Sequence, residues 1–310
     1  MSINANGGDA LATNPACQLT REATCFDEIL KVLRPKIEEG ISNRLPRFFT
    51  EDSLKRLFGN SRYAYDTESA TKVLLDPIWD MLDRGGKRWR PALLMLVADA
   101  VRSVESDARL DSTLLSCAYL CELVHNGSLI TDDIEDDSRL RRGKPCLHLT
   151  YGQDVAINTG NAMYFLPLHV LREMKENGHP DSVIISAYQM YGEELTKLHL
   201  GQSLDIWWHL GKKLPSVNEY LQMCAYKTGT LARLSARLAA LVCGGTPEQI
   251  DAFGYFAESV GIAFQIQDDV LNLVGDEFAQ KNRHSRRGHL RRQTIPHGHS
   301  LPGTRLAGKI

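Results

Sequence analysis

The 310-residue sequence has few of the features that mark membrane, secreted or metal-finger proteins. It contains no run of about 20 apolar residues, which a membrane-spanning helix needs. Residues 1–20 have no apolar core of the kind a secretory signal peptide carries. The seven cysteines are scattered without metal-type spacing, and their odd number argues against a disulfide framework. We therefore expect a cytoplasmic protein in a reducing compartment, with organellar targeting left open.

Net charge is also low, at −2, so bulk electrostatics favour no particular partner. One segment departs from this balance. Residues 278–310 contain eight Lys or Arg and no Asp or Glu, so the rest of the chain has 28 basic residues against all 38 acids, a net charge of −10. Residues 1–25 are polar, rich in Gly and Asn, and predicted to be disordered.

Strand-like alternation of polar and apolar residues is almost absent. Apolar residues instead recur at i, i+3 and i+4, the spacing of helices, and Gly or Pro pairs mark the breaks. Several of these segments are apolar nearly all round, which predicts buried helices. The sequence therefore predicts an all-α bundle with long helices around a central core. The predicted helices lie within residues 26–41, 68–86, 91–101, 110–130, 154–174, 183–208, 217–245 and 247–275.

Five acids occupy the six positions from Asp132 to Asp137, directly after an apolar helix. Asp132 and Asp136 are four residues apart, so both carboxylates face one side of a helix. Like charges at this spacing are destabilising unless a cation lies between them. Mg²⁺ is held by one or two carboxylates together with phosphate and water oxygens. The alternative is a solvated acidic turn, because a lone DDxxD motif has a high false-positive risk.

A second acidic pair, Asp268 and Asp269, lies inside another apolar helix. Buried carboxylates are unfavourable unless their charge is compensated. Two such clusters facing each other across a bundle would suit a bound polyphosphate with its metal ions. Asn272 stands where a third carboxylate would complete the second cluster, so this cluster is predicted to be the weaker metal site.

Basic side chains are grouped beside these acids. Arginine offers a planar fork suited to phosphate and lysine a point charge, although each alone is more often a solvated surface charge. His125 lies about two turns before the first acids. This grouping predicts two diphosphate sites, one bridged by metal and one held by basic side chains alone. The basic residues are Lys87, Arg88 and Arg90 in GGKRWRP, and Arg141 and Arg142 after the acids.

These motifs resemble those of the trans-isoprenyl diphosphate synthases, most closely the geranylgeranyl diphosphate synthases. They follow the family order from about residue 76 to residue 281. The resemblance implies an isoprenoid-synthase-type bundle of antiparallel helices around a central apolar cavity, usually a homodimer. The matching segments are GGKRWRP, ELVHNGSLITDDIEDDSRLRRGKP, INTGNAMYF, LHLGQSLDIWW, YKTGTL and FQIQDDVLNLVGDEF.

The resemblance implies a Mg²⁺-dependent condensation of isopentenyl diphosphate with dimethylallyl, geranyl or farnesyl diphosphate, by ionisation, condensation and elimination. This reaction requires no nucleophilic Ser or Cys and no redox cofactor. The resemblance implies small-molecule substrates and no nucleic-acid partner. The implied catalytic residues are Asp132, Asp133, Asp136, Arg141 and Lys227. The implied ligands of Mg²⁺, more than one ion, are Asp132, Asp136 and Asp268. The implied substrate-binding residues are Lys87, Arg90, His125 and Arg142 for isopentenyl diphosphate, and Arg141, Lys227, Thr228 and Gln265 for the allylic substrate.

Product length is expected to follow the depth of the apolar pocket beneath the first acidic cluster. Farnesyl-type enzymes often carry aromatics at the positions of Gly127 and Ser128, so this floor is predicted to be open. Tyr164, Phe165 and His199 resemble the residues of a deeper pocket floor in fungal-like geranylgeranyl diphosphate synthases. The alternative for such aromatics is ordinary core packing. The resemblance favours a C20 product, with C15 or a longer chain as alternatives.

After about Lys281 the resemblance stops. The codons available for residues 292–302, read one base later, yield GKRSLMVIHSL, which is typical of the family. We therefore expect a frameshift, a mis-spliced exon or a gene-model error near this point. The predicted organisation is a synthase domain over residues 26–281 that lacks its C-terminal helices, followed by a basic tail over residues 282–310. The rival interpretation of this tail, a segment that binds nucleic acid or anionic lipid, is weakened because it has no interleaved aromatics and no amphipathic period.

The same motifs bear on other classes of function. An impaired synthase, or a non-catalytic subunit that regulates an intact one, is favoured by the altered C-terminus but not by the intact acidic and arginine motifs. A terpene cyclase would share the acidic motif, yet it needs no isopentenyl site such as GGKRWRP.

Overall fold

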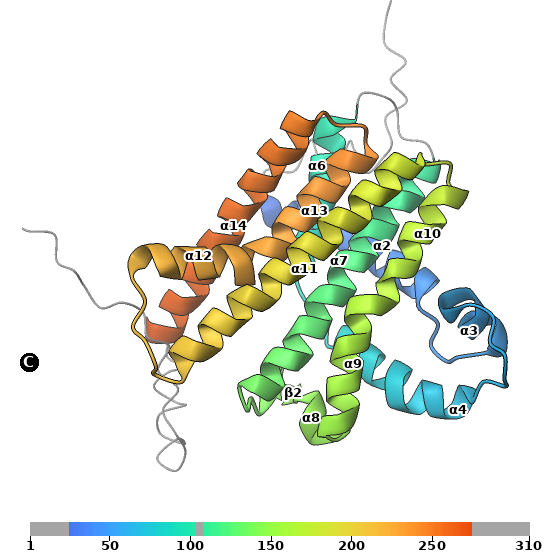
Figure 1. The fold of residues 1–310 in the computed structure, drawn as a ribbon, viewed down its shortest axis with the longest axis horizontal. Helices are drawn as coiled ribbons and strands as arrows, with labels where there is room; N and C mark the ends of the chain where they lie inside the picture. The colour runs from blue at the N-terminus through green and yellow to red at the C-terminus, as the bar shows by residue number, and fades with distance from the viewer. Residues whose placement is uncertain (1–24, 103–107, 275–310) are drawn as a thin grey trace, which may run out of the picture. The chain divides into compact units, whose positions relative to one another are not determined.

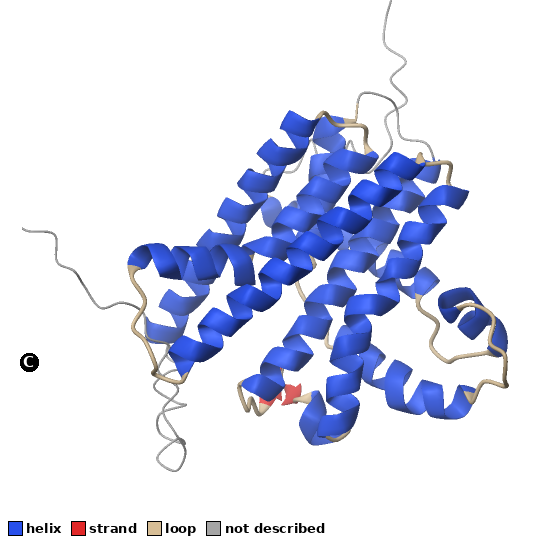
Figure 2. Ribbon diagram, in the orientation of Figure 1, coloured by secondary structure: helices blue, strands red, loops and turns tan. Residues whose placement is uncertain are grey.

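The computed structural model describes residues 25–102 and 108–274. Within these residues all regular structure is helical except one pair of two-residue strands, so the prediction of an all-α fold is confirmed (Figure 2). The predictions for the N-terminal segment, the basic tail and the C-terminal helices lie outside the described residues. So does the side chain of Asn272.

The described chain divides into two compact units. The first comprises Met1–Tyr188 and Ser235–Asp251 within the described residues, and the second comprises Gln189–Leu234 and the residues that follow Asp251. The elements are α2 (Phe26–Arg44), α3 (Glu51–Phe58), α4 (Thr67–Ala70), η1 (Thr71–Leu75), α5 (Asp76–Asp83), α6 (Trp89–Val101), α7 (Ala108–Glu135), β1 (Leu140–Arg141), β2 (Lys144–Pro145), α8 (Leu147–Thr150), α9 (Gln153–Phe165), η2 (Leu166–Leu168), α10 (His169–Glu176), α11 (Asp181–His209), α12 (Val217–Lys227), α13 (Gly229–Val242) and α14 (Pro247–Val274).

The core of the first unit is built around α7, which is buried along most of its length. Helices α2, α6, α9 and α10 pack against it, and α9 lies along its side (Figure 1). Tyr119 and Leu120, near the middle of α7, have no exposed surface. A helix covered on several sides must be apolar nearly all round, which explains the weak amphipathic pattern of this segment.

The second unit packs the remaining helical segments around a smaller apolar cluster. Trp208 of α11 and Met223 and Cys224 of α12 form its buried centre, with Ile262 of α14 packed against them. Helix α12 begins with a capping box, in which Ser216 and Glu219 bond each other's backbone N–H groups.

The segment predicted as one helix over residues 68–86 is divided into α4, a π-helical turn (η1) and α5. Pro77 lies in the first turn of α5, where its missing N–H is tolerated. By contrast, α2 continues through Pro35 without ending. Among the described residues, no helix combines the length and the apolar character that crossing a membrane requires.

Candidate functional site

The first acidic cluster lies where α7 ends. α7 stops at Glu135, but the backbone N–H of Asp136 still donates to the carbonyl of Asp132 at 2.8 Å. The two residues therefore stay one helical turn apart, although Asp136 is outside the helix. Both side chains are partly exposed, so both carboxylates reach solvent.

Asp133, between these two acids, is only 2% exposed and is paired with Arg141. Nε of Arg141 lies 3.0 and 3.1 Å from the two carboxylate oxygens of Asp133, and Nη2 lies 2.5 Å from Oδ1. Nη2 also lies 3.8 Å from Oδ2 of Asp132. The resemblance implied that Asp133 is one of the catalytic residues, and this role stays a prediction. In the structure Asp133 is the buried partner that holds Arg141 beside Asp132.

A short hairpin presents the two arginines that follow the cluster. Strands β1 and β2 pair antiparallel, and Arg142 and Gly143 form the loop between them. Their φ angles are 52° and 78°, the two positive values that a type I′ turn requires. The two arginines therefore contact different partners. Arg141 pairs with Asp133, whereas Nη1 of Arg142 donates to Oδ1 of Asn126 at 3.2 Å and to the carbonyl of Gly85.

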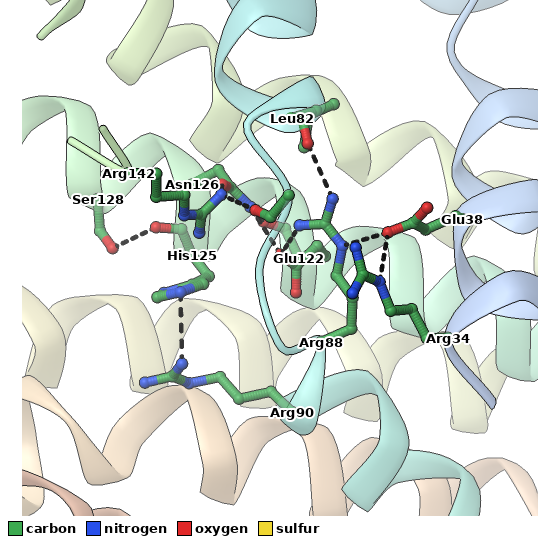
Figure 3. Close-up of polar contacts among 11 residues, drawn as sticks. Arg34, Glu38, Leu82, Arg88, Arg90, Glu122, His125, Asn126, Ser128 and Arg142 are labelled. Atoms are coloured by element: carbon green, nitrogen blue, oxygen red, sulfur yellow. Dashed lines mark hydrogen bonds and ion pairs between the residues drawn. The ribbon is translucent and has the colours of Figure 1, made fainter. Parts of the chain in front are cut away.

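The structure brings the four residues predicted to hold isopentenyl diphosphate to one small pocket in the first unit. Figure 3 labels Arg90, His125 and Arg142 of this set. They come from the segment before α6, from α6 itself, from α7 and from the β1–β2 hairpin, so no single element forms the pocket. The pocket-lining residues are Gly86, Lys87, Arg88, Trp89, Arg90, Glu122, His125 and Arg142. We call this set the basic pocket.

His125 is electrically neutral in the basic pocket. Burial lowers the pKa of His125 well below its usual value, and the charges of Arg90 and Arg142 lower it further. Nη1 of Arg90 lies 3.5 Å from Nε2 of His125. Arginine stays protonated, so Nε2 is the acceptor and the ring hydrogen is assigned to Nδ1.

This lowered pKa predicts how stability depends on pH. The unfolded chain binds a proton at His125 near pH 6.5, whereas the folded chain binds one only at lower pH. The stabilisation is complete above pH 6.5 and is lost as the pH falls toward the folded pKa. We expect His125→Gln to lose less stability between pH 7 and pH 5 than the wild type, in urea titrations at each pH. Parallel pH profiles for the two proteins would contradict this assignment.

The second acidic pair is divided between surface and interior. Asp268 is exposed, whereas Asp269 is 4% exposed. Burial raises the pKa of Asp269, opposed by hydrogen bonds from the Tyr220 hydroxyl at 2.5 Å and from Nε2 of Gln265 at 3.0 Å. The prediction that this helix buries both carboxylates is therefore wrong for Asp268. One face of α14 is exposed to solvent at this position, so Asp269 faces inward and the adjacent Asp268 faces outward.

The predicted allylic-site residues of the second unit are also tied to neighbours. Nζ of Lys227 lies 2.6 Å from Oδ2 of Asp205, on α11. The hydroxyl of Thr228 donates to Oε1 of Gln265 at 2.5 Å, and the amide of Gln265 continues to Asp269. Both ends of the Gln265 amide are therefore occupied, which fixes its orientation.

The acidic side chains of the described residues fit Mg²⁺ as a pair rather than as a closed set of three ligands. Among the described residues no three His, Cys, Asp or Glu side chains converge on one point. Asp132 and Asp136 belong to the first unit and Asp268 to the second. Two carboxylates one turn apart still fit Mg²⁺, because this ion keeps several waters and takes phosphate oxygens as ligands. The binding of Mg²⁺ by these three residues stays a prediction.

The predicted chain-length residues differ in their packing and exposure. Gly127 lies where α7 crosses α9, and a Cβ added there would be 2.8 Å from Cβ of Met163 and 3.0 Å from the carbonyl of Gly160. The missing side chain at Gly127 therefore allows close helix packing, and the prediction of open space at this position is wrong. Ser128 is half-buried, and its hydroxyl donates to the carbonyl of His125 at 2.8 Å.

The three residues of the predicted deeper floor differ in exposure. Tyr164 is buried, but Phe165 is 69% exposed in the single chain, and His199 is exposed as well. Nδ1 of His199 lies 2.8 Å from the carbonyl of Leu195, one turn earlier on α11. Of these three side chains, only Tyr164 has the burial that an interior floor needs.

Gly127→Ala is expected to lower the free energy of unfolding by about 1–3 kcal/mol, since the new methyl group would overpack the crossing of α7 and α9. Gly192→Ala is the matched control, because nothing lies within 4 Å of a Cβ at this exposed position in α11. The control should be stabilised by about 0.5–1 kcal/mol through helix propensity. Equal unfolding midpoints for the two variants in urea would contradict the close crossing.

The comparison with known proteins agrees with this arrangement. The model of the polyprenyl synthetase family matches residues 71–285, most of the chain. The chain belongs to this family. The predicted resemblance to the isoprenyl diphosphate synthases is thereby confirmed.

The relatives of the chain within the family include geranylgeranyl pyrophosphate synthases. That of Dictyostelium discoideum is 33% identical over 219 residues, which are 70% of this chain and 66% of that protein. That of Rhodocybe pseudopiperita is 36% identical over 193 residues, or 61% of this chain and 53% of that protein. The solved geranylgeranyl pyrophosphate synthetase of Pyrococcus horikoshii matches with a TM-score of 0.66 and 27% identity, over 83% of this chain and 70% of that chain. The chain thus spans about half to two thirds of the length of the curated relatives it matches.

Two polar residues of the family motif ELVHN were not assigned a role from the sequence. Glu122 and Asn126 are buried in α7, and Glu122 lines the basic pocket. The signal was present in the sequence, since two polar residues four apart interrupt a helix that is otherwise apolar. Polar residues at buried positions need partners, and here they bond each other and two arginines.

Proposed function

We propose that the chain is a prenyltransferase that condenses isopentenyl diphosphate with an allylic diphosphate to give geranylgeranyl diphosphate. The observation that carries the proposal is the basic pocket. Lys87, Arg90, His125 and Arg142 are up to 55 positions apart in the sequence, yet they line one pocket. Three cations around a neutral imidazole suit a diphosphate held without metal.

The allylic diphosphate is proposed to bind at the first acidic cluster. Asp132 and Asp136 would hold Mg²⁺, with Asp268 as a further ligand. Bound Mg²⁺ stabilises the negative charge that develops on the departing diphosphate. Arg141 contributes to the same stabilisation, and its pairing with Asp133 keeps its guanidinium beside Asp132 without reorganisation during the reaction.

The proposed reaction breaks the C–O bond of the allylic substrate, and the diphosphate leaves with the electron pair. The alkene of isopentenyl diphosphate attacks the allylic carbon, a C–C bond forms, and a proton is lost to the released diphosphate. Lys227, Thr228 and Gln265 would line the allylic site. Exclusion of water protects the cationic intermediate from quenching.

The proposed product has 20 carbons. Support comes from the relatives, which include the geranylgeranyl pyrophosphate synthases of Rhodocybe pseudopiperita and Dictyostelium discoideum. No aromatic side chain stands at Ser128 to shorten the pocket. A homodimer is proposed from the family resemblance alone.

The test is an incubation of the 310-residue chain with Mg²⁺, isopentenyl diphosphate and farnesyl diphosphate, with the product identified by mass. A C20 product that disappears when Mg²⁺ is chelated supports the proposal. A matched protein with the reading frame restored near residue 281 serves as the positive control. If neither protein forms a prenyl diphosphate, the proposed function is wrong. If only the control does, this chain is the impaired synthase that the sequence left as an alternative.

A further inference from the structure

The basic pocket contains one carboxylate, that of Glu122, which is 3% exposed. Its Oε1 accepts a hydrogen bond from Nη1 of Arg88 at 2.5 Å and another from Nδ2 of Asn126 at 2.8 Å (Figure 3). Asn126 has no exposed surface, and its Nδ2 also donates to the backbone carbonyl of Glu122 at 2.8 Å. The orientation of the Asn126 amide is therefore set by Glu122.

The other end of this amide holds Arg142. With Nδ2 directed at Glu122, Oδ1 of Asn126 is left to accept from Nη1 of Arg142 at 3.2 Å. The same Nη1 donates to the carbonyl of Gly85. A Cβ at Gly86 would lie 3.2 Å from Nη2 of Arg142, so the guanidinium packs directly over this glycine. Figure 3 shows the resulting series from Arg88 through Glu122 and Asn126 to Arg142.

Arg88 anchors the first end of this series. It has a left-handed backbone with a φ of 56° and precedes α6. Its Nη2 donates to the carbonyl of Leu82 at 3.0 Å, and its Nε lies 3.6 Å from Oε1 of Glu38. Arg88 is buried and bound on several sides, so it is a fixed reference for Glu122 rather than a side chain free to reach a ligand.

A carboxylate in an anion-binding pocket is unfavourable by charge alone, because it repels a diphosphate. Its geometric effect on diphosphate binding is favourable. By holding the guanidinium of Arg142 in place, it reduces the side-chain entropy that Arg142 would otherwise lose when the diphosphate binds. We propose that Glu122, acting through Asn126, is a positioning residue that holds Arg142 in place for the diphosphate of isopentenyl diphosphate. This inference rests on the proposed function.

The two effects of Glu122 predict opposite results for Glu122→Gln, which keeps the shape and removes the charge. If repulsion dominated, isopentenyl diphosphate would bind more tightly to the variant. Positioning predicts instead that the Kd rises about tenfold, the size expected when a hydrogen bond to a charged acceptor is replaced by a weaker one to a neutral amide. The measurement is isothermal titration of isopentenyl diphosphate into the full chain without Mg²⁺. An unchanged or lower Kd overturns the inference.

A double-mutant cycle tests whether Glu122 acts through Arg142. Arg142→Gln alone is expected to weaken binding, and adding Glu122→Gln to it should then raise the Kd less than twofold. The changes in binding free energy caused by two mutations are non-additive when the two residues act as a unit. They add when the two residues act independently. If the double variant shows the product of the two single effects, Glu122 does not position Arg142.

Two further variants distinguish a specific loss of binding from a general loss of folding. Asn126→Leu removes the connecting amide and leaves the pair between Glu122 and Arg88, so it should weaken binding as Glu122→Gln does. Glu194→Gln is the matched control, because Glu194 is a buried carboxylate paired with Arg233 in the second unit. Its loss should lower stability without a selective change in the Kd. An Asn126→Leu variant with wild-type affinity overturns the inference. A wild-type chain that does not bind isopentenyl diphosphate overturns the proposed function and the inference with it.

Discussion

Asp132→Asn is expected to lower kcat/KM for the proposed condensation about 10³-fold or more, equivalent to about 4 kcal/mol of transition-state stabilisation. Asp132 is partly exposed, one turn from Asp136 and beside the guanidinium of Arg141. The amide keeps the shape of the side chain and removes the charge on which Mg²⁺ binding depends. Folding should be unaffected, because the side chain already reaches solvent. The measurement is the rate of diphosphate release as a function of Mg²⁺ concentration.

Asp137→Asn is the matched control for this variant. Asp137 belongs to the same acidic run, is exposed, and has a left-handed φ of 46°. Asn tolerates that conformation, so the control removes one negative charge without strain. We expect it to retain kcat/KM within about twofold, since an exposed charge is screened by solvent. Equal losses in the two variants would mean that only the total charge of the run matters, and the assignment of Asp132 as a metal ligand would be wrong.

Arg233→Leu is expected to lower the free energy of unfolding by about 3–5 kcal/mol, since it leaves a buried carboxylate without its partner. Glu194 has no exposed surface. Nε of Arg233 lies 3.0 and 2.8 Å from the two oxygens of Glu194, and Nη2 donates to Thr230 at 3.2 Å. Nη1 donates to Glu258 on α14, so one guanidinium joins α11, α13 and α14 within the second unit.

The measurement is urea unfolding followed by circular dichroism. Lys175→Leu is the control, because Lys175 forms an ion pair with Asp181 in which both side chains are 70% exposed. Removing such a pair is expected to change stability by less than about 1 kcal/mol. If Arg233→Leu unfolds at the same urea concentration as the control, the buried cluster does not stabilise the second unit.

The helices were predictable because their signal is local. Apolar residues at helical spacing located α6 and α7, and the absence of a polar face on α7 correctly indicated burial on several sides. The ends of the helices were less predictable. Asp136 lies outside α7, and the segment before GGKRWRP contains a π-helical turn. Such details depend on the hairpin and helices packed nearby, which local spacing does not encode.

The basic pocket was predictable in membership, since the motifs supplied Lys87, Arg90, His125 and Arg142, but the roles of the surrounding residues were not. Among the acids, the sequence did not distinguish the partly exposed Asp132 from the buried Asp133, or the exposed Asp268 from the buried Asp269. Adjacent residues on a helix point about 100° apart, so burial depends on where the neighbouring helix lies. The same limit applied to Gly127, whose missing side chain suggested an open pocket floor until the crossing with α9 was known.

The sequence alone determined the helical class, the family and the one-turn spacing of the two acids, because each follows from residues close together in the chain or from motifs in a fixed order. The tertiary structure decided which charges are paired. Glu122 bonds Arg88 across 34 positions, and Arg233 bonds Glu194 across 39. Such pairs form only when separate helices pack together, since the desolvation of a buried charge is offset by a partner brought there by the fold.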